Sequence, residues 1–209
     1  MYLSHSPPWL QWLYPSLTWH KSRKEKSIYL TFDDGPIPVV TPFVLNTLKN
    51  FNARATFFCI GDNAAKFPEL YSDLISAGHS VGNHTFNHLK GWNTANKDYL
   101  SNIAKCSELI PSNLFRPPYG KIKKSQISAI RSSFPDMEII MWDVLSGDFD
   151  ASITNHQCLQ NVLKNTGNGS IIVFHDSMKA FEKLQYVLPA ALENLSSRGF
   201  SFEPIELDD

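Results

Sequence analysis

Short apolar runs alternate along the chain with longer stretches in which apolar residues recur at helical spacing. The apolar runs, which predict buried strands, are residues 27–32, 55–60, 79–82, 113–115, 137–142, 170–174 and 200–203. The helical stretches between them are residues 41–49, 64–77, 94–110, 125–133, 154–167 and 182–199. Strands that are joined through helices run parallel, so we predict an α/β domain with about seven parallel strands. An open doubly wound sheet and a closed barrel both fit this alternation.

Capping residues support several of the predicted helix ends. Thr41 followed by Pro42 is typical of a helix start, because threonine caps free N–H groups and proline has none to satisfy. Thr154 and Gln157 have the spacing of a capping box. Gly78 is typical of a helix end, where the backbone often needs a positive φ.

The composition is that of a globular protein with one core. The 209 residues are 43% apolar, and 19 basic side chains nearly balance 20 acidic ones, giving a net charge of −1. The balanced charge excludes the basic face that a nucleic-acid partner requires, and the apolar content excludes a disordered chain. Cys59, Cys106 and Cys158 are scattered, so we expect buried free thiols in a reducing compartment rather than disulfides or a thiolate zinc site.

Residues 1–20 differ from the rest because they are rich in aromatic side chains and interrupted by prolines. They lack the features of a secretory signal, and no apolar run is long enough to span a bilayer, so the expected location is cytoplasmic or undetermined. We assign residues 1–20 as an aromatic N-terminal arm and residues 21–209 as a single domain. The tryptophans of the arm are expected to pack on this domain. The alternative is peripheral membrane contact through Trp9, Trp12 and Trp19.

Candidate metal ligands follow the first and third predicted strands. Asp33 and Asp34 are adjacent carboxylates, which are tolerated best where a cation neutralises one of them. His84 and His88 are four residues apart and can reach one ion. An Asp-Asp-Gly-Pro string is also a common turn, and an isolated histidine pair is a modest signal. Together, two histidines and one carboxylate suit zinc or a similar divalent ion.

Further polar residues follow the other strands. Arg116 and Tyr119 come after the fourth predicted strand, Asp143 and Asp148 after the fifth, and His175 after the sixth. The carboxyl ends of parallel strands meet at one face of the sheet. We therefore expect these residues and the candidate metal ligands to form one site.

The motifs in this order resemble the polysaccharide deacetylases, the NodB-homology carbohydrate esterases. The resemblance covers residues 28–202 and rests on five motifs: T-F-D-D-G-P at 31–36, H-T-x-x-H at 84–88, R-P-P-Y-G at 116–120, W-D-V-x-S-x-D at 142–148 and I-I-V-x-H-D at 171–176. It implies a distorted (β/α) barrel of about seven parallel strands rather than an open sheet. It also implies that residues 21–209 are a catalytic domain that hydrolyses acetyl groups on sugars with the help of a divalent metal.

The resemblance assigns roles to individual residues. Asp34, His84 and His88 would be ligands of one divalent ion, zinc before other transition metals. Asp33 would be the general base that deprotonates the attacking water, and Arg116 would keep that carboxylate ionised and oriented.

The leaving amine would take its proton from His175, whose pKa Asp148 would raise. The backbone N–H of Tyr119 would stabilise the oxyanion. Phe149 and Val173 stand where the family usually has tryptophan and leucine, which leaves the shape of the acyl group open. The expected substrate pocket consists of Tyr119, Trp142, Phe149 and Val173.

The expected function is removal of acetyl groups from an N-acetylated polysaccharide or oligosaccharide. Two alternatives stay open at this stage. One is hydrolysis of another non-peptide C–N bond, in a cyclic imide or ureide, and the other is a module that binds metal or glycan without turnover. The near-neutral charge favours an uncharged acetylated saccharide as the partner.

Overall fold

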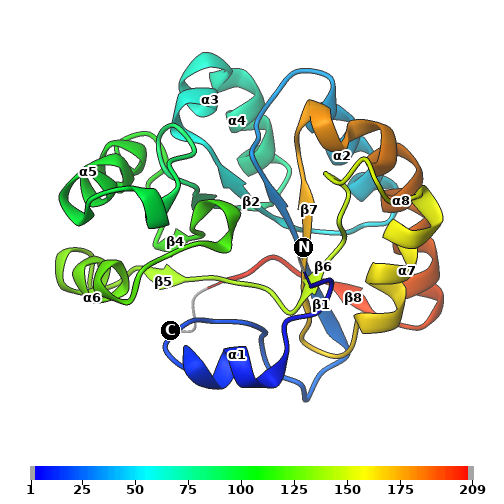
Figure 1. Ribbon diagram of the computed structural model, residues 1–209. Helices are drawn as coiled ribbons and strands as arrows, with labels where there is room; N and C mark the ends of the chain where they lie inside the picture. Colours follow the sequence, from blue (N-terminus) through cyan, green and yellow to red (C-terminus); the bar gives the residue numbers. More distant parts are fainter. Residues whose placement is uncertain (1–2, 207–209) are drawn as a thin grey trace.

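The computed structural model describes residues 3–206, which form a curled parallel sheet surrounded by helices (Figure 1). The order of the strands in the sheet is β5-β4-β3-β2-β1-β7-β6, and β8 pairs with the start of β1. Each of these strand pairs is parallel, which confirms the predicted α/β barrel-like class. The strands are β1 (Ser27–Asp33), β2 (Thr56–Cys59), β3 (Ser80–Asn83), β4 (Leu114–Phe115), β5 (Glu138–Ile139), β6 (Val144–Leu145), β7 (Ile171–His175) and β8 (Ser201–Phe202).

The longer helices lie around the outside of the curled sheet (Figure 1). The α-helices are α1 (Pro8–Leu13), α2 (Val40–Asn50), α3 (Gly61–Lys66), α4 (Pro68–Ser76), α5 (Asn96–Ser107), α6 (Lys124–Ser133), α7 (Asn155–Asn165) and α8 (Met178–Ser197), with short 3₁₀ turns at Gly91–Asn93 and Pro118–Gly120. None of the helices within residues 3–206 has the length and apolar character needed to cross a bilayer. The three cysteines are buried and free.

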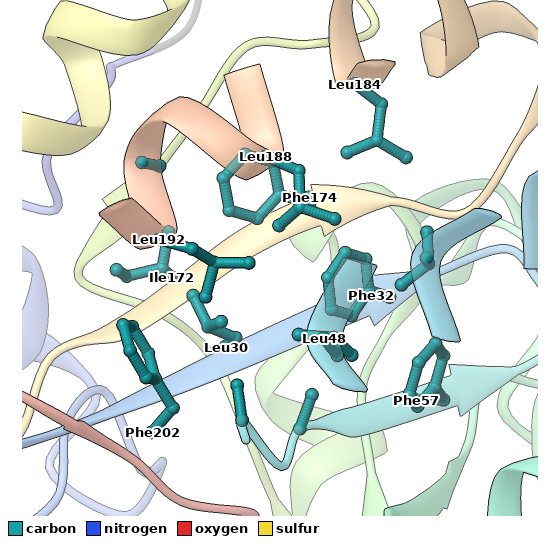
Figure 2. Packing of buried hydrophobic residues seen from close by; sticks show 14 of the residues in the cluster. Leu30, Phe32, Leu48, Phe57, Ile172, Phe174, Leu184, Leu188, Leu192 and Phe202 are labelled. Carbon is teal, nitrogen blue, oxygen red and sulfur yellow. The ribbon is translucent and has the colours of Figure 1, made fainter. Parts of the chain in front are cut away.

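The central strand β1 separates the main core from the interior of the curled sheet. Leu30 and Phe32 point to the helical side, where they pack with Leu188 of α8 and other apolar residues (Figure 2). The ring of Phe32 stacks on Phe57 at a centroid distance of 5.0 Å. Because side chains alternate along a strand, Thr31 and Asp33 of β1 point to the opposite face. The alternation of side chains along β1, with Leu30 and Phe32 on the helical side, therefore determines that Asp33 faces the interior of the curled sheet.

The N-terminal arm fills the gap between the two edges of the sheet. Thr18 forms a bridge with Ile140, just after β5, and His20 forms one with Ser170, just before β7. Trp19 is buried in a second apolar cluster, together with residues of β4, α5 and α6. The arm is thus part of the barrel wall.

The prediction that the tryptophans of the arm pack on the domain is right for Trp19 and wrong for two others. Trp9 is 61% exposed and Trp12 is 81% exposed, because both lie on the outer side of the short helix α1. The membrane contact considered for these residues stays a prediction. The assignment of residues 1–20 and 21–209 also stays a prediction, since residues 1–2 and 207–209 lie outside the described part.

One predicted strand is shortened and one predicted helix is divided in the structure. The predicted strand at 137–142 ends at Ile139, and a new strand, β6, begins at Val144 after the chain has crossed to the edge of β7. Asp143 stabilises this crossing by accepting hydrogen bonds from the backbone N–H of Ile171 and from Ser170. The predicted helix at 64–77 is split at Phe67, because Pro68 disfavours a helical residue before it.

Two predicted helix starts lie too far along the chain. Helix α2 begins at Val40, so Thr41 is not its cap. Instead, the Thr41 hydroxyl accepts a hydrogen bond from the N–H of Ile37 and donates one to Asp176. Helix α8 begins at Met178 rather than at residue 182. The capping box of Thr154 and Gln157 is confirmed, with both reciprocal hydrogen bonds present.

Candidate active site

One cavity of about 850 Å³ lies at the carboxyl ends of the strands. Its lining includes nine of the eleven candidate site residues from the sequence: Asp33, Asp34, His84, His88, Tyr119, Trp142, Phe149, Val173 and His175. The other two, Arg116 and Asp148, are fully buried and bind residues of this lining. The loops after different strands therefore form one site, as the topology predicts.

Asp34, His84 and His88 could hold a metal ion. Their candidate ligand atoms all lie within 4.8 Å of one another. Oδ1 of Asp34 lies 3.2 Å from Nε2 of His88 and 3.7 Å from Nε2 of His84. This oxygen is buried and has no well-oriented hydrogen-bond donor among the described residues, which is costly unless a cation occupies the space. Two imidazoles and one carboxylate form a donor set that suits zinc and leaves positions open.

The protonation of His84 and Asp34 also fits a metal site. Burial lowers the pKa of His84 to about 4, so its imidazole is neutral near pH 7. Nδ1 of His84 is bonded to the carbonyl of Arg116 at 2.8 Å, which leaves Nε2 with the lone pair toward Asp34. Burial alone would raise the pKa of Asp34, but the neighbouring imidazoles, above all His88, hold it well below its ordinary value.

Asp33 is bound to Arg116 inside the curled sheet. Nη1 of Arg116 donates to Oδ1 of Asp33 at 2.8 Å and to the Thr31 hydroxyl at 2.7 Å. Its other nitrogens donate to the carbonyls of Ile140 and Met141 at 3.2 and 2.9 Å. A guanidinium held at four points cannot rotate away, so it fixes one oxygen of Asp33 and leaves the other available to the cavity.

His175 and Asp148 form a second ion pair on the opposite side of Asp33. Oδ1 of Asp148 lies 2.8 Å from Nδ1 of His175, and Oδ2 accepts the backbone N–H of the same histidine at 2.7 Å. Burial would lower the pKa of His175, but the charge and hydrogen bond of Asp148 outweigh it and raise the pKa to about 9. The imidazole is therefore protonated near neutral pH, and Nε2 is its remaining N–H donor.

Several residues of the site adopt backbone conformations that L-amino acids rarely adopt. Six non-glycine residues among 3–206 have positive φ, and four of them belong to the site loops: Asp34 (83°), Thr85 (64°), His88 (59°) and Tyr119 (61°). Each such conformation costs about 1–3 kcal/mol and persists where the surrounding structure requires it. Concentration of strain at one cavity is typical of a functional site.

Aromatic side chains form the walls next to the ion pairs. Phe149 contacts His175 edge to face with centroids 5.0 Å apart, and Tyr119 lies 4.6 Å from the ring of His88. Trp142 closes the space beside Gly120, where a Cβ atom would lie 2.4 Å from the indole.

The structure shows the contacts of two residues that the motifs contain but to which the sequence analysis assigned no role. Thr31 helps to hold Arg116, and Asp176 is a fully buried carboxyl behind the loop of Asp34. Burial raises the pKa of Asp176 to about 7. The sequence signal for both residues was their place in a motif, Thr31 in T-F-D-D-G-P and Asp176 beside His175 in I-I-V-x-H-D. Asp143, considered alongside Asp148, lies outside the cavity lining and has a structural role.

Comparison with known proteins identifies relatives over most of the chain. Residues 20–133 match the family described as polysaccharide deacetylase. A peptidoglycan-N-acetylglucosamine deacetylase of Bacillus cereus is 32% identical over 195 residues, which cover 89% of this chain and 89% of that protein. A chitooligosaccharide deacetylase of Azorhizobium caulinodans is 32% identical over 206 residues, covering 88% of this chain and 95% of that protein.

A solved structure also has the same fold. The Bc1960 peptidoglycan N-acetylglucosamine deacetylase, in complex with 4-naphthalen-1-yl-N-oxidanyl-benzamide, superposes with a TM-score of 0.86. The two sequences are 28% identical, and the match covers 93% of this chain and 94% of that one. The resemblance found in the motifs is thereby confirmed, and the chain belongs to the polysaccharide deacetylase family.

Proposed function

We propose that this protein is a metal-dependent deacetylase that hydrolyses the N-acetyl group of an acetylated saccharide. The observation that carries this proposal is the convergence of three groups in one cavity: the candidate ligands around Asp34, the Asp33–Arg116 pair and the His175–Asp148 pair. The relatives named as N-acetylglucosamine and chitooligosaccharide deacetylases support the same substrate class.

Asp34, His84 and His88 would hold a divalent ion, zinc before other transition metals. Such an ion acts as a Lewis acid, which polarises a carbonyl group and lowers the pKa of water in its vicinity. The buried Oδ1 of Asp34, which has no well-oriented hydrogen-bond donor among the described residues, and the neutral imidazole of His84 are suited to this role.

Asp33 would accept the proton of the attacking water. Its carboxylate lies at the end of β1, next to the candidate ligands, and its charge is compensated by the immobile guanidinium of Arg116. As the water oxygen bonds to the acetyl carbon, one proton moves to Asp33 and negative charge develops on the carbonyl oxygen. The backbone N–H of Tyr119 would donate a hydrogen bond to that oxygen.

His175 would protonate the leaving nitrogen when the C–N bond breaks. An amine leaves poorly as an anion, so the reaction requires a proton donor on the side away from the base. Asp148 keeps His175 protonated by raising its pKa to about 9. The products are acetate and the free amino sugar.

The acetyl group would lie among the aromatic and aliphatic walls of the cavity. Trp142, Phe149 and Val173 line it beside Tyr119. Such a pocket favours a small apolar acyl group, because the walls exclude water from its methyl.

Acetate release from N-acetylglucosamine oligomers tests this proposal. The wild-type protein should release acetate, and a chelator should stop the reaction until zinc is restored. Asp33→Asn should reduce kcat by at least about a hundredfold, in keeping with loss of a general base. Asp136→Asn, at an exposed position distant from the cavity lining, is the matched control and should keep full activity.

Three outcomes would contradict the proposal. Release that is unaffected by the chelator would exclude the metal role. If no acetylated saccharide of a panel releases acetate and a cyclic imide or ureide is hydrolysed, the protein is instead a hydrolase of another C–N bond. Zinc binding without turnover of any substrate would favour a binding module.

A further inference from the structure

The catalytic cavity continues past the proposed acetyl pocket to the N-terminal arm. The same cavity that contains the candidate metal ligands is lined on its far side by arm residues, among them Leu3, Pro7, Leu10 and Tyr14. Leu10 lies in α1, and Pro7 and Tyr14 flank this helix at its two ends, whereas Trp9 and Trp12 are exposed and are not part of the lining. The arm therefore forms one wall of the substrate cavity.

The floor of this extension is apolar. It consists of buried residues of the second apolar cluster, namely Leu17, Trp19, Ile122 and Met141. The floor joins the catalytic part of the cavity at Trp142, which packs against the same cluster. A group attached to the sugar can thus continue from the candidate metal ligands onto an apolar surface.

Three of the hydrogen-bond donors that line the extension are already in use. The Ser6 hydroxyl donates to the carbonyl of Trp142 at 2.7 Å. The indole N–H of Trp19 donates to Tyr14, and that of Trp92 donates to Ile122, each at 3.2 Å. A second sugar ring has many hydroxyl groups that need partners on burial, whereas a hydrocarbon chain needs none. The extension therefore suits a hydrocarbon better than a sugar.

We infer that the preferred substrate is an amphipathic N-acetylated amino sugar, whose glycosidic substituent is a hydrocarbon chain lying between the arm and the floor at Trp19 and Met141. This inference rests on the proposed deacetylase function and adds the chemical class of the group attached to the sugar. The chain would be removed from water over much of its length, which contributes about 0.8 kcal/mol per methylene.

The test compares three substrates under conditions in which none forms micelles. These are the methyl and octyl glycosides of N-acetylglucosamine, and N,N′-diacetylchitobiose. Burial of only two methylenes raises kcat/KM by about tenfold, so the octyl glycoside should exceed the methyl glycoside by at least that factor. The kcat/KM of the disaccharide should exceed that of the methyl glycoside by a smaller factor than the kcat/KM of the octyl glycoside does.

Substitutions on the two sides of the arm test whether its inward side causes the preference for the octyl glycoside. Leu10→Asp places a charge on the inward side of α1 and should reduce the preference for octyl over methyl by about tenfold or more. Leu3→Asp, at a position 57% exposed and therefore without risk to folding, should reduce it in the same direction. Trp12→Ala, on the outward side of α1, is the matched control and should leave the preference unchanged.

Equal kcat/KM for the octyl and methyl glycosides would overturn the inference while leaving the deacetylase function intact. A larger gain for the disaccharide, or a preference that survives both aspartate substitutions, would also overturn it. If none of the three substrates releases acetate, the deacetylase function fails. In that case calorimetric titration decides the inference, which requires the octyl glycoside to bind at least about tenfold more tightly than the methyl glycoside.

Discussion

The replacement Asp148→Asn tests whether Asp148 keeps the imidazole of His175 protonated. The substitution keeps the shape of a fully buried side chain but removes the charge that faces Nδ1 of His175. In the wild-type protein the pKa of His175 is about 9, compared with 6.5 for an ordinary histidine. Without the charge and hydrogen bond of Asp148, burial is opposed only by the charges of Asp34 and Asp33, so the pKa of His175 should fall toward 6.5.

The expected effect on activity follows from the protonated fraction of His175. At about pH 8, a group with a pKa of about 9 is roughly nine tenths protonated, whereas one with a pKa of 6.5 is about 3% protonated. If His175 is the general acid, the variant should lose about thirtyfold in kcat/KM at about pH 8 and much less at about pH 5.5. A bound cation lowers the pKa of His175 in the wild-type protein and in the variant alike. The measured quantity is therefore the difference in pH between the alkaline limbs of their two kcat/KM profiles.

The assay is the rate of acetate release across the pH range, with Asp136→Asn as the control for an exposed aspartate. Stability gives a second readout. Since the folded pKa of His175 is raised, its contribution is fully present below about pH 6.5 and is lost as the pH rises through about 9. The contribution of His175 to the free energy of unfolding is about 3 kcal/mol in total. The variant should lack this pH dependence in urea unfolding. A folded variant whose rate of acetate release declines at the same alkaline pH as that of the wild-type protein would refute the reasoning.

Other perturbations test the remaining parts of the site. Zinc at a hundredfold excess over its Kd should stabilise the protein by about 2.7 kcal/mol, seen as a higher Tm, and Asp34→Ala should abolish this shift. Arg116→Lys should destabilise the fold by about 3–5 kcal/mol in urea unfolding, because an ammonium cannot replace the fork that binds Asp33 and three other oxygens. Gly35→Ala should cost about 1–3 kcal/mol in the same assay, since its Cβ would lie 2.2 Å from Oδ2 of Asp176. Unchanged unfolding free energies in the last two variants would contradict the packing described for them.

The sheet could be predicted from the sequence because its signals are local. Runs such as 27–32 and 170–174 are rich in apolar and β-branched residues, and parallel strands that are buried on both faces have this pattern. The early end, at Ile139, of the strand predicted at 137–142 depends instead on tertiary contacts. Met141 and Trp142 look like strand residues, but they belong to a crossing segment held by Asp143 and by Arg116.

The candidate site could be predicted only as far as chain order determines position. The carboxyl ends of the strands meet in every parallel barrel, so Asp34, His84 and His175 were expected together. The sequence could not show that Trp19 and Leu10 belong to the same cavity. The arm precedes β1, and its contact with the edges at Ile140 and Ser170 depends on the width of the gap, which no local pattern encodes.

The register between β1 and β7 relates the proposed base to the proposed acid. Asp33 and His175 are direct cross-strand partners, so the sheet itself fixes their separation. Each has a buried partner of opposite charge, Arg116 for the carboxylate and Asp148 for the imidazolium. Buried ion pairs seldom add net stability, because desolvation offsets their attraction. Two such pairs side by side are explained better by chemistry, since together they keep a proton acceptor and a proton donor adjacent at the same pH.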